Sequence, residues 1–346
     1  MAPPRSLPVS YKYGEEYTLR EHVVTRGVKE GQGRPLLLSP SDATRYASKE
    51  ALYRERRSDL GEPGLNLKKV IFKAPIRIGP ECGSQILLTE EGDVAKVYDP
   101  LCYRFIDPYY EQKVDVVSQA EYQFQNEALA YSALREAGLC GSVVPGYLGS
   151  WTITLADPTA RGKDQGREVH LILMEYVEGV EMSEVPVEAV SDATRQGIMV
   201  GVMEALTDLM LSGVEHNSFE PYNIILPGDY KSMSFSASNQ SPYRDRANRV
   251  CVIDFALSHT DRVESSERED CQCRKCIAKT HRNPLYFWAG TDKFSQYGWL
   301  PWDLREATDW MWQVWGKPTE EKYSPAERDE KCSFGQPLRA DRGQAN

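Results

Sequence analysis

The chain has 346 residues, 41% of them hydrophobic, which is enough for one large domain or for two lobes with a substantial core. Its formal net charge of −10 and its pI of about 5.2 argue against general binding to nucleic acid or to anionic membranes. No apolar run approaches the ~20 residues of a membrane span. The N-terminus lacks the apolar core of a signal peptide, so we expect a cytoplasmic or nuclear protein whose eight cysteines are reduced thiols.

Residues 1–65 are polar and charged, with few periodic apolar positions. We interpret them as an N-terminal extension that is partly helical around residues 41–57 and otherwise loosely ordered. The pattern changes at Leu67, so a packed domain is expected only from about that residue onward.

An antiparallel meander of three strands is predicted next, over residues 70–78, 85–89 and 94–98, with a glycine-containing turn between the first two. Apolar residues at helical spacing predict a helix over residues 121–135, which Gly138 ends. Two further strands are expected over residues 143–151 and 170–174, joined by a polar loop at 157–167, and a hinge is expected at 175–179.

The second half of the chain is predicted to be mainly helical. A long buried helix is expected over residues 191–211, with short strands over 224–226 and 250–253. Residues 229–249 are rich in serine, asparagine and arginine and are interpreted as an exposed insertion. Six of the seven tryptophans fall between Trp288 and Trp315, which indicates an aromatic core, and residues 317–346 are read as a polar tail.

Residues 216–223, with the sequence HNSFEPYN, carry the most information about function. They have the layout H-x-D-x-x-P-x-N, and Asp254-Phe255-Ala256 follows with the layout of D-F-G. With the preceding strands, helix and hinge in this order, residues 67–316 resemble the protein-kinase-like fold. The resemblance implies an α+β, bilobal structure, with a small antiparallel-sheet N-lobe over residues 66–179 and a reduced, mainly helical C-lobe over residues 180–316.

Lys96, in the sequence VAKV, matches the lysine that fixes the α- and β-phosphates of ATP in this family. Glu127 matches the glutamate that pairs with this lysine and keeps it charged, and Glu121 on the same predicted helix is a rival. A solvent-facing strand lysine and a solvated helix carboxylate are the alternative interpretations.

Gly79 and Gly83 stand where the family has its G-x-G-x-x-G loop, whose backbone N–H groups approach phosphate. Only two glycines are present and Glu81 between them would repel phosphate, so an ordinary hairpin turn is an equal alternative. Glu175 and Val177 match the hinge whose backbone binds adenine, next to Met174 at the gatekeeper position.

Asn223 and Asp254 match the two ligands of Mg²⁺, an ion that prefers carboxylate, carbonyl and phosphate oxygens. Asp254 follows four apolar residues, and a charge at the end of a buried strand needs a partner or a metal ion. A capping role is the alternative for Asp254. Ala256 replaces the glycine of D-F-G and narrows the backbone freedom of that turn.

Ser218 stands at the position of the catalytic aspartate, which orients the attacking hydroxyl and accepts its proton. Serine cannot act as a base near neutral pH without an activating partner. Glu220 occupies the position of a family lysine that contacts the transferred phosphate, and so reverses that charge. It is also the candidate for a rescuing base, ahead of Glu215, while His216 matches a histidine with a structural role.

A second cluster, Cys271, Cys273, Cys276 and His281, has most of a zinc-knuckle spacing. Zn²⁺ binds four nitrogen or sulfur ligands in a tetrahedron, and such close spacing allows this within a short loop. The alternative interpretation is a loop with free thiols.

These residues favour a kinase-like protein that binds ATP with Mg²⁺ and has lost phosphate transfer, a pseudokinase or regulator that contacts an unidentified protein partner. An active phosphotransferase with a shifted base, acting on a protein or a small molecule, is the second hypothesis. A nucleotide-free scaffold is the third. The degenerate motifs look similar to divergent, fungal-type kinase-like proteins.

Overall fold

The computed structural model describes residues 11–24, 35–56, 63–80, 82–156, 166–232, 249–260, 283–286, 291–316, 323 and 326. The chain divides into two compact units. The first contains Met1–Ser132, Gly146–Tyr176 and Phe255–Ser258, and the second contains Ala133–Pro145, Val177–Asp254 and His259–Asn346. Helices and antiparallel sheets occur together, which confirms the α+β class predicted from the sequence.

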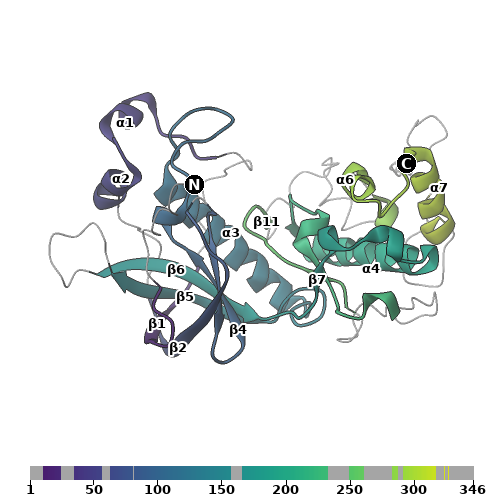
Figure 1. The fold of residues 1–346 in the computed structure, drawn as a ribbon, viewed down its shortest axis with the longest axis horizontal. Coiled ribbons are helices and arrows are strands. Elements are labelled where there is room, and N and C mark those ends of the chain that lie inside the picture. The colour runs from purple at the N-terminus through teal and green to yellow at the C-terminus, as the bar shows by residue number, and fades with distance from the viewer. Residues whose placement is uncertain are drawn as a thin grey trace, which may run out of the picture. The chain divides into compact units, whose positions relative to one another are not determined.

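A six-stranded antiparallel sheet that closes on itself forms most of the first unit (Figure 1). Its order is β1-β2-β3-β4-β6-β5, so none of these strands is left with an unpaired edge. The predicted second and third strands occur almost as expected, because each is a short apolar run and Glu91-Gly92 forms the turn between them. The six strands are β1 (Glu16–His22), β2 (Pro63–Arg77), β3 (Gln85–Thr89), β4 (Asp93–Tyr98), β5 (Tyr147–Ala156) and β6 (Gly166–Glu175).

Strand β1 corrects the prediction that the N-terminal extension is loosely ordered outside residues 41–57. It pairs with β2 on one side and β5 on the other, and Leu19 at its centre is fully buried. The sequence of this strand, EYTLREH, does not predict a buried strand, because Leu19 is its one aliphatic residue. The helical character expected around residues 41–57 is present as α1 (Pro40–Arg45) and α2 (Lys49–Glu55).

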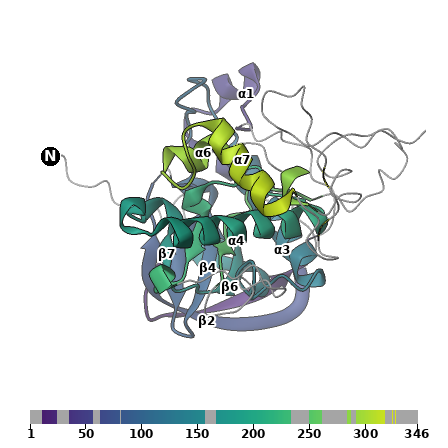
Figure 2. The ribbon, with the colours of Figure 1, turned by 90° about the vertical axis from the view of Figure 1, so that its right-hand side faces the viewer.

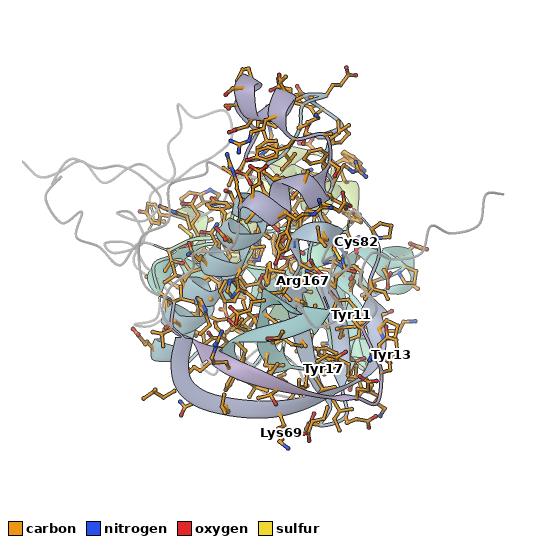
Figure 3. All side chains as sticks on the ribbon, turned by 90° about the vertical axis from the view of Figure 1, so that its left-hand side faces the viewer. Tyr11, Tyr13, Tyr17, Lys69, Cys82 and Arg167 are labelled. Carbon is orange, nitrogen blue, oxygen red and sulfur yellow. The ribbon has the colours of Figure 1, made fainter. Side chains whose placement is uncertain are left out.

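A buried ion pair joins the start of β6 to the end of β4. Arg167 donates to both carboxylate oxygens of Asp99, at 2.6 Å and 2.5 Å, and both side chains are at most 1% exposed. The Arg167 guanidinium also lies 6.0 Å from the ring centroid of Tyr53 (its place in the unit is labelled in Figure 3). The prediction of a polar loop through residue 167 is therefore wrong at this residue, because Asp99 supplies the charge that lets an arginine enter the core.

Helix α3 (Val116–Glu136) begins five residues earlier than the sequence predicts. The carboxylate of Asp115 accepts a hydrogen bond of 3.1 Å from the backbone N–H of Ser118, as an N-cap does. Val116 and Val117, in the first turn, are buried. The helix ends as predicted near Gly138, whose φ of +72° suits glycine.

Two histidines are buried against each other in the first unit. The rings of His22 and His170 have centroids 4.6 Å apart, and Thr152 Oγ1 lies 3.2 Å from His170 Nδ1 and 3.4 Å from His22 Nδ1. Burial, followed by the nearby charges of His22 and Arg20, lowers the pKa of His170 to about 3. Burial also lowers the pKa of His22, with Arg20 adding to the effect and Glu168 opposing it.

Acid is therefore expected to destabilise the first unit between pH 6.5 and about pH 3. In this window the unfolded chain protonates His170 and the folded chain does not, so stability falls as pH falls, by about 1.4 kcal/mol per pH unit. About 2 kcal/mol should be lost from this group between pH 6.5 and pH 5. Urea unfolding at a series of pH values checks this prediction. The free energy of unfolding of His170→Gln should change less with pH than that of the wild type, and an equal change in both proteins would contradict the prediction.

The second unit is built around α4 (Asp192–Leu211), which Ser191 caps by accepting a 3.1 Å hydrogen bond from the Thr194 N–H. α6 (Thr291–Gln296) and α7 (Leu304–Trp315) follow late in the chain, and α7 crosses α4 at an angle (Figure 2). A buried cluster joins α4 to α7, and its members are Met203, Leu285, Met311 and Trp315. Two small sheets complete the unit, one of β7 (Val180–Glu181), β9 (Ile224–Leu226) and β10 (Cys251–Val252), the other of β8 (Val214–Glu215) and β11 (His259–Thr260).

The tryptophans divide between core and surface. Trp299 and Trp315 are buried as the predicted aromatic core requires, whereas Trp302 is 73% exposed. In the predicted tail, the Tyr323 hydroxyl donates to the carboxylate of Glu204 on α4. Most of the predicted insertion, residues 233–248, lies outside the described residues. Its last residue, Arg249, is buried rather than exposed and donates a 2.5 Å hydrogen bond to the Gly141 carbonyl.

No helix among the described residues is both long and apolar enough to cross a membrane.

Candidate functional site

The first unit presents a buried lysine–glutamate pair. Lys96 Nζ on β4 lies 2.6 Å from Glu127 Oε2 on α3, and their side chains are 4% and 0% exposed. The Tyr98 hydroxyl donates to the same carboxylate oxygen. Because β4 is covered on both faces, its lysine is not solvent-facing, and Glu127 rather than Glu121 is its ion-pair partner. Each charge depends on the other, since an uncompensated buried charge is strongly destabilising.

The Gly79–Gly83 turn is held by one fully buried side chain, that of Gln85. Gln85 accepts a 2.7 Å hydrogen bond from the Gly79 N–H and donates to the carbonyls of Gly79 and Gly83, at 3.1 Å and 3.0 Å. The Gly83 N–H donates to Cys102 O at 3.4 Å. These two glycine N–H groups already have acceptors within the protein, so this turn is better suited to closing a hairpin than to binding phosphate. Glu81 lies outside the described residues.

Gln85→Met is expected to lower the free energy of unfolding by about 1–3 kcal/mol, because it removes three hydrogen bonds to part-buried backbone groups of the turn. Chemical unfolding monitored by circular dichroism measures the loss. Gln112→Met, at an exposed glutamine of the same unit, is the matched control and should change stability by no more than about 0.5 kcal/mol. Equal effects in the two variants would show that Gln85 does not hold the turn.

The predicted hinge coincides with the boundary between the two units, which falls after Tyr176. Glu175 is fixed to Gly146 in two ways: its carboxylate accepts from the Gly146 N–H at 2.9 Å, and its own N–H donates to Gly146 O at 2.8 Å. Met174 is buried and receives a 3.6 Å contact from the Tyr131 hydroxyl. Val177 belongs to the second unit and is half-buried.

In the second unit, His216 ties the 216–223 loop to the strand before Asp254. Its buried ring places Nε2 2.9 Å from the Ile253 carbonyl, and Nδ1 accepts from the Ser218 N–H at 3.3 Å. These contacts require a proton on Nε2 and none on Nδ1. The Ile253 N–H donates to Asn223 O at 2.9 Å, so the loop holds the residue preceding Asp254 at both of its backbone groups.

Two other polar side chains of the loop, those of Asn223 and Tyr222, meet at Ser218. Asn223 Nδ2 donates to the Ser218 carbonyl at 2.9 Å and lies 3.3 Å from its hydroxyl, which in turn lies 3.3 Å from the Tyr222 hydroxyl. Since the Asn223 amide nitrogen is used in this way, its Oδ1 is the atom with the chemistry to ligate a cation. Asn217 and Asp254 have φ values of +58° and +65°, a left-handed conformation that non-glycine residues adopt mainly at constrained sites.

Glu220 has a cationic neighbour that the sequence motif does not contain. Lys293 Nζ on α6 lies 3.6 Å from Glu220 Oε2. Burial raises the pKa of Tyr222; its hydrogen bond to Ser218 lowers that pKa, and its contact with Glu220 raises it. Ser218, Tyr222, Glu220 and Lys293 therefore form one connected chain of polar side chains. Sequence reasoning missed Lys293 because it lies far beyond the loop along the chain, on a separate helix.

The cysteine and histidine cluster, Cys271, Cys273, Cys276 and His281, lies outside the described residues, and zinc binding there stays a prediction. Within the described part of the chain, no group of three or more histidine, cysteine, aspartate or glutamate side chains is placed to hold a metal ion. The two Mg²⁺ candidates, Asn223 and Asp254, offer one amide oxygen and one carboxylate, a donor set that suits Mg²⁺ only together with waters or phosphate oxygens.

No family model and no curated protein matches the sequence. Among solved structures, WbdD is 14% identical over 59% of this chain and 38% of its own, with a TM-score of 0.34. The Cydia pomonella granulovirus kinase PK-1 is 14% identical over 55% and 52%, and the M. tuberculosis PknI kinase domain is 16% identical over 54% and 58%, each with a TM-score of 0.32. The chain thus spans less than two thirds of each of these structures, and such TM-scores do not establish a shared fold.

Proposed function

We propose that this chain is a kinase-like protein that binds ATP with Mg²⁺ and acts as a pseudokinase or regulator, without transferring the phosphate. The observation that carries the proposal is the buried Lys96–Glu127 ion pair, at 2.6 Å. A buried ion pair is weak evidence for stability, because apolar residues of similar volume serve as well or better. Its presence on the strand and helix where the kinase motif needs it supports a role in binding an anionic ligand.

In the second unit, the proposal rests on the loop around Ser218. Asn223 Oδ1 and the Asp254 carboxylate would hold Mg²⁺, which would neutralise phosphate charge when bound. Ser218 cannot take a proton from an attacking hydroxyl as the family aspartate does, and its own hydroxyl is engaged by Tyr222 and Asn223. Binding without transfer is the function that this combination supports best.

An active phosphotransferase is the second candidate, and one contact favours it. The Tyr222 hydroxyl contacts both the Ser218 hydroxyl and the Glu220 carboxylate. Glu220 is therefore linked by hydrogen bonds to the position at which the family has its catalytic base. Lys293 opposes this role, because its ammonium already pairs with the Glu220 carboxylate, 3.6 Å from Oε2. The nucleotide-free scaffold is the third candidate, which the internally bonded Gly79–Gly83 turn favours.

Calorimetric titration of the full chain with ATP, in the presence and absence of Mg²⁺, tests the binding half of the proposal. We expect saturable binding that Mg²⁺ strengthens, and Asp254→Ala should lose the strengthening by Mg²⁺ while Glu178→Ala, an exposed acidic control, keeps it. Absence of binding in the wild type would support the scaffold instead. Transfer of the γ-phosphate that Glu220→Gln abolishes would support the shifted base.

A further inference from the structure

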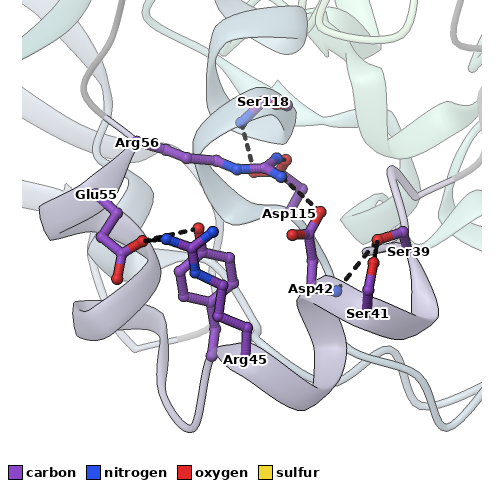
Figure 4. Close-up of polar contacts among 9 residues, drawn as sticks. Ser39, Ser41, Asp42, Arg45, Glu55, Arg56, Asp115 and Ser118 are labelled. Carbon is purple, nitrogen blue, oxygen red and sulfur yellow. Dashed lines mark hydrogen bonds and ion pairs between the residues drawn. The ribbon is translucent and has the colours of Figure 1, made fainter.

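Residues 35–56, which the sequence assigns to the partly helical stretch of a polar N-terminal extension, pack against the N-terminal end of α3. We call this segment the brace; it contains α1 and α2 (Figure 4). Helix α3 carries Glu127, the partner of Lys96, so anything that fixes α3 bears on the lysine–glutamate pair.

Backbone hydrogen bonds tie the start of the brace to the residues that lead into α3. The Asp115 N–H donates to Leu36 O at 2.7 Å, and the Leu38 N–H donates to Lys113 O at 2.9 Å. The Leu36 N–H donates to the Gln119 side chain, in the first turn of α3, at 2.9 Å. The brace is thus bonded on both sides of the residue at which the helix begins.

Arg56, at the end of the brace, forms the charged part of the contact (Figure 4). It pairs with Asp115, the residue that caps α3, and at 2.7 Å with Asp42 of α1. The Asp115 side chain is 7% exposed, so solvent screens this ion pair less than a pair between two fully exposed side chains. One guanidinium therefore links α1, α2 and the cap of α3.

Further contacts reinforce the same attachment. Lys113 Nζ donates to two backbone carbonyls at the C-terminal end of α1, those of Ala43 and Tyr46, both at 2.8 Å. Tyr53 of α2 packs in a buried cluster with Leu101 and with Val117 of α3. Polar and apolar contacts thus converge on one end of one helix.

We propose that the brace positions Glu127 against Lys96, with Arg56 as a positioning residue; the inference rests on the proposed nucleotide binding. Glu127 lies 11 residues after Val116, about 17 Å along the helix axis. Over that length an α-helix behaves as a rod, so a shift at its capped end moves Glu127 relative to β4. The lysine–glutamate pair must be in place for kinase-type nucleotide handling, and in this chain the holding element is part of the same polypeptide.

The test compares three variants of the full chain by ATP–Mg²⁺ titration and by hydrogen exchange. Arg56→Met should weaken nucleotide binding about tenfold and speed amide exchange across residues 116–127, with α4 unchanged. Arg56→Lys keeps a cation for Asp115 and should retain most of the affinity. Arg45→Met is the matched control, because Arg45 forms its ion pair with Glu55 inside the brace rather than with the cap of α3.

Wild-type affinity in Arg56→Met, or an equal loss in Arg45→Met, would overturn the inference. If the wild type binds no nucleotide, the proposed function fails, and hydrogen exchange alone then decides the role of the brace. Faster exchange confined to residues 116–127 in Arg56→Met would support positioning of α3, and unchanged exchange there would overturn it.

Discussion

Replacing Arg167 by leucine is expected to lower the free energy of unfolding by about 3–5 kcal/mol. Arg167 and Asp99 are both at most 1% exposed, and leucine would leave the Asp99 carboxylate in the core without its cation. The carboxylate also accepts a 3.0 Å hydrogen bond from the Leu101 N–H, so it cannot turn away without breaking a second interaction. Chemical unfolding with a probe in the first unit measures the effect.

An exposed ion pair on the same sheet is the control. Lys69 and Glu16 are 2.7 Å apart, but their side chains are 70% and 49% exposed, so Lys69→Met should cost at most about 1 kcal/mol. The double variant Arg167→Leu with Asp99→Asn removes both charges and should recover part of the loss. An Arg167→Leu protein no less stable than Lys69→Met would show that this pair does not hold the first unit together.

Lys96→Met is expected to weaken ATP–Mg²⁺ binding by about 2–5 kcal/mol, the loss typical of removing one partner from a buried charged contact. The variant removes the ammonium that would meet the phosphates and also leaves Glu127 without its cation, so the folded state is weakened as well. Calorimetry measures the affinity, and thermal unfolding without nucleotide separates the effect on stability.

Lys73→Met serves as its control, because Lys73 lies on β2 of the same sheet and its side chain is exposed. It should bind nucleotide as the wild type does. If Lys96→Met binds ATP with unchanged affinity, the buried pair is a structural ion pair and the nucleotide proposal loses its main support.

Regular alternation and helical periodicity predict the parts of the fold in which apolar residues outnumber polar ones. β3, β4 and α4 occur within one or two residues of their predicted bounds. β1 escapes the same reasoning because Leu19 is its one aliphatic residue and its neighbours in the closed sheet come from far along the chain. The burial of Arg167 is not predicted either, because an arginine is assigned to the surface unless its buried partner is known.

Some residues of the candidate site can be predicted from motif spacing, and others become apparent only in the folded structure. Motif spacing predicts the pairing of Lys96 with Glu127, and the structure places these two side chains 2.6 Å apart. The Mg²⁺ roles of Asn223 and Asp254 stay predictions. Lys293 and Arg56 act through contacts that spacing does not encode, since each meets its partner through the folded chain rather than through the motif. Gln85 lies next to the glycine turn, but the motif assigns no role to this position. The sequence therefore indicates the type of site, and the structure adds the residues that position it or close it.

The most direct test of binding without transfer is phosphorus NMR of ATP with one equivalent of the full chain and Mg²⁺. We predict that the three ATP resonances broaden or shift on binding and that the γ-phosphate signal then persists for hours. Unchanged resonances would show that the chain does not bind ATP. Loss of the γ-phosphate signal, with the appearance of ADP, would show that it transfers or hydrolyses the phosphate despite Ser218.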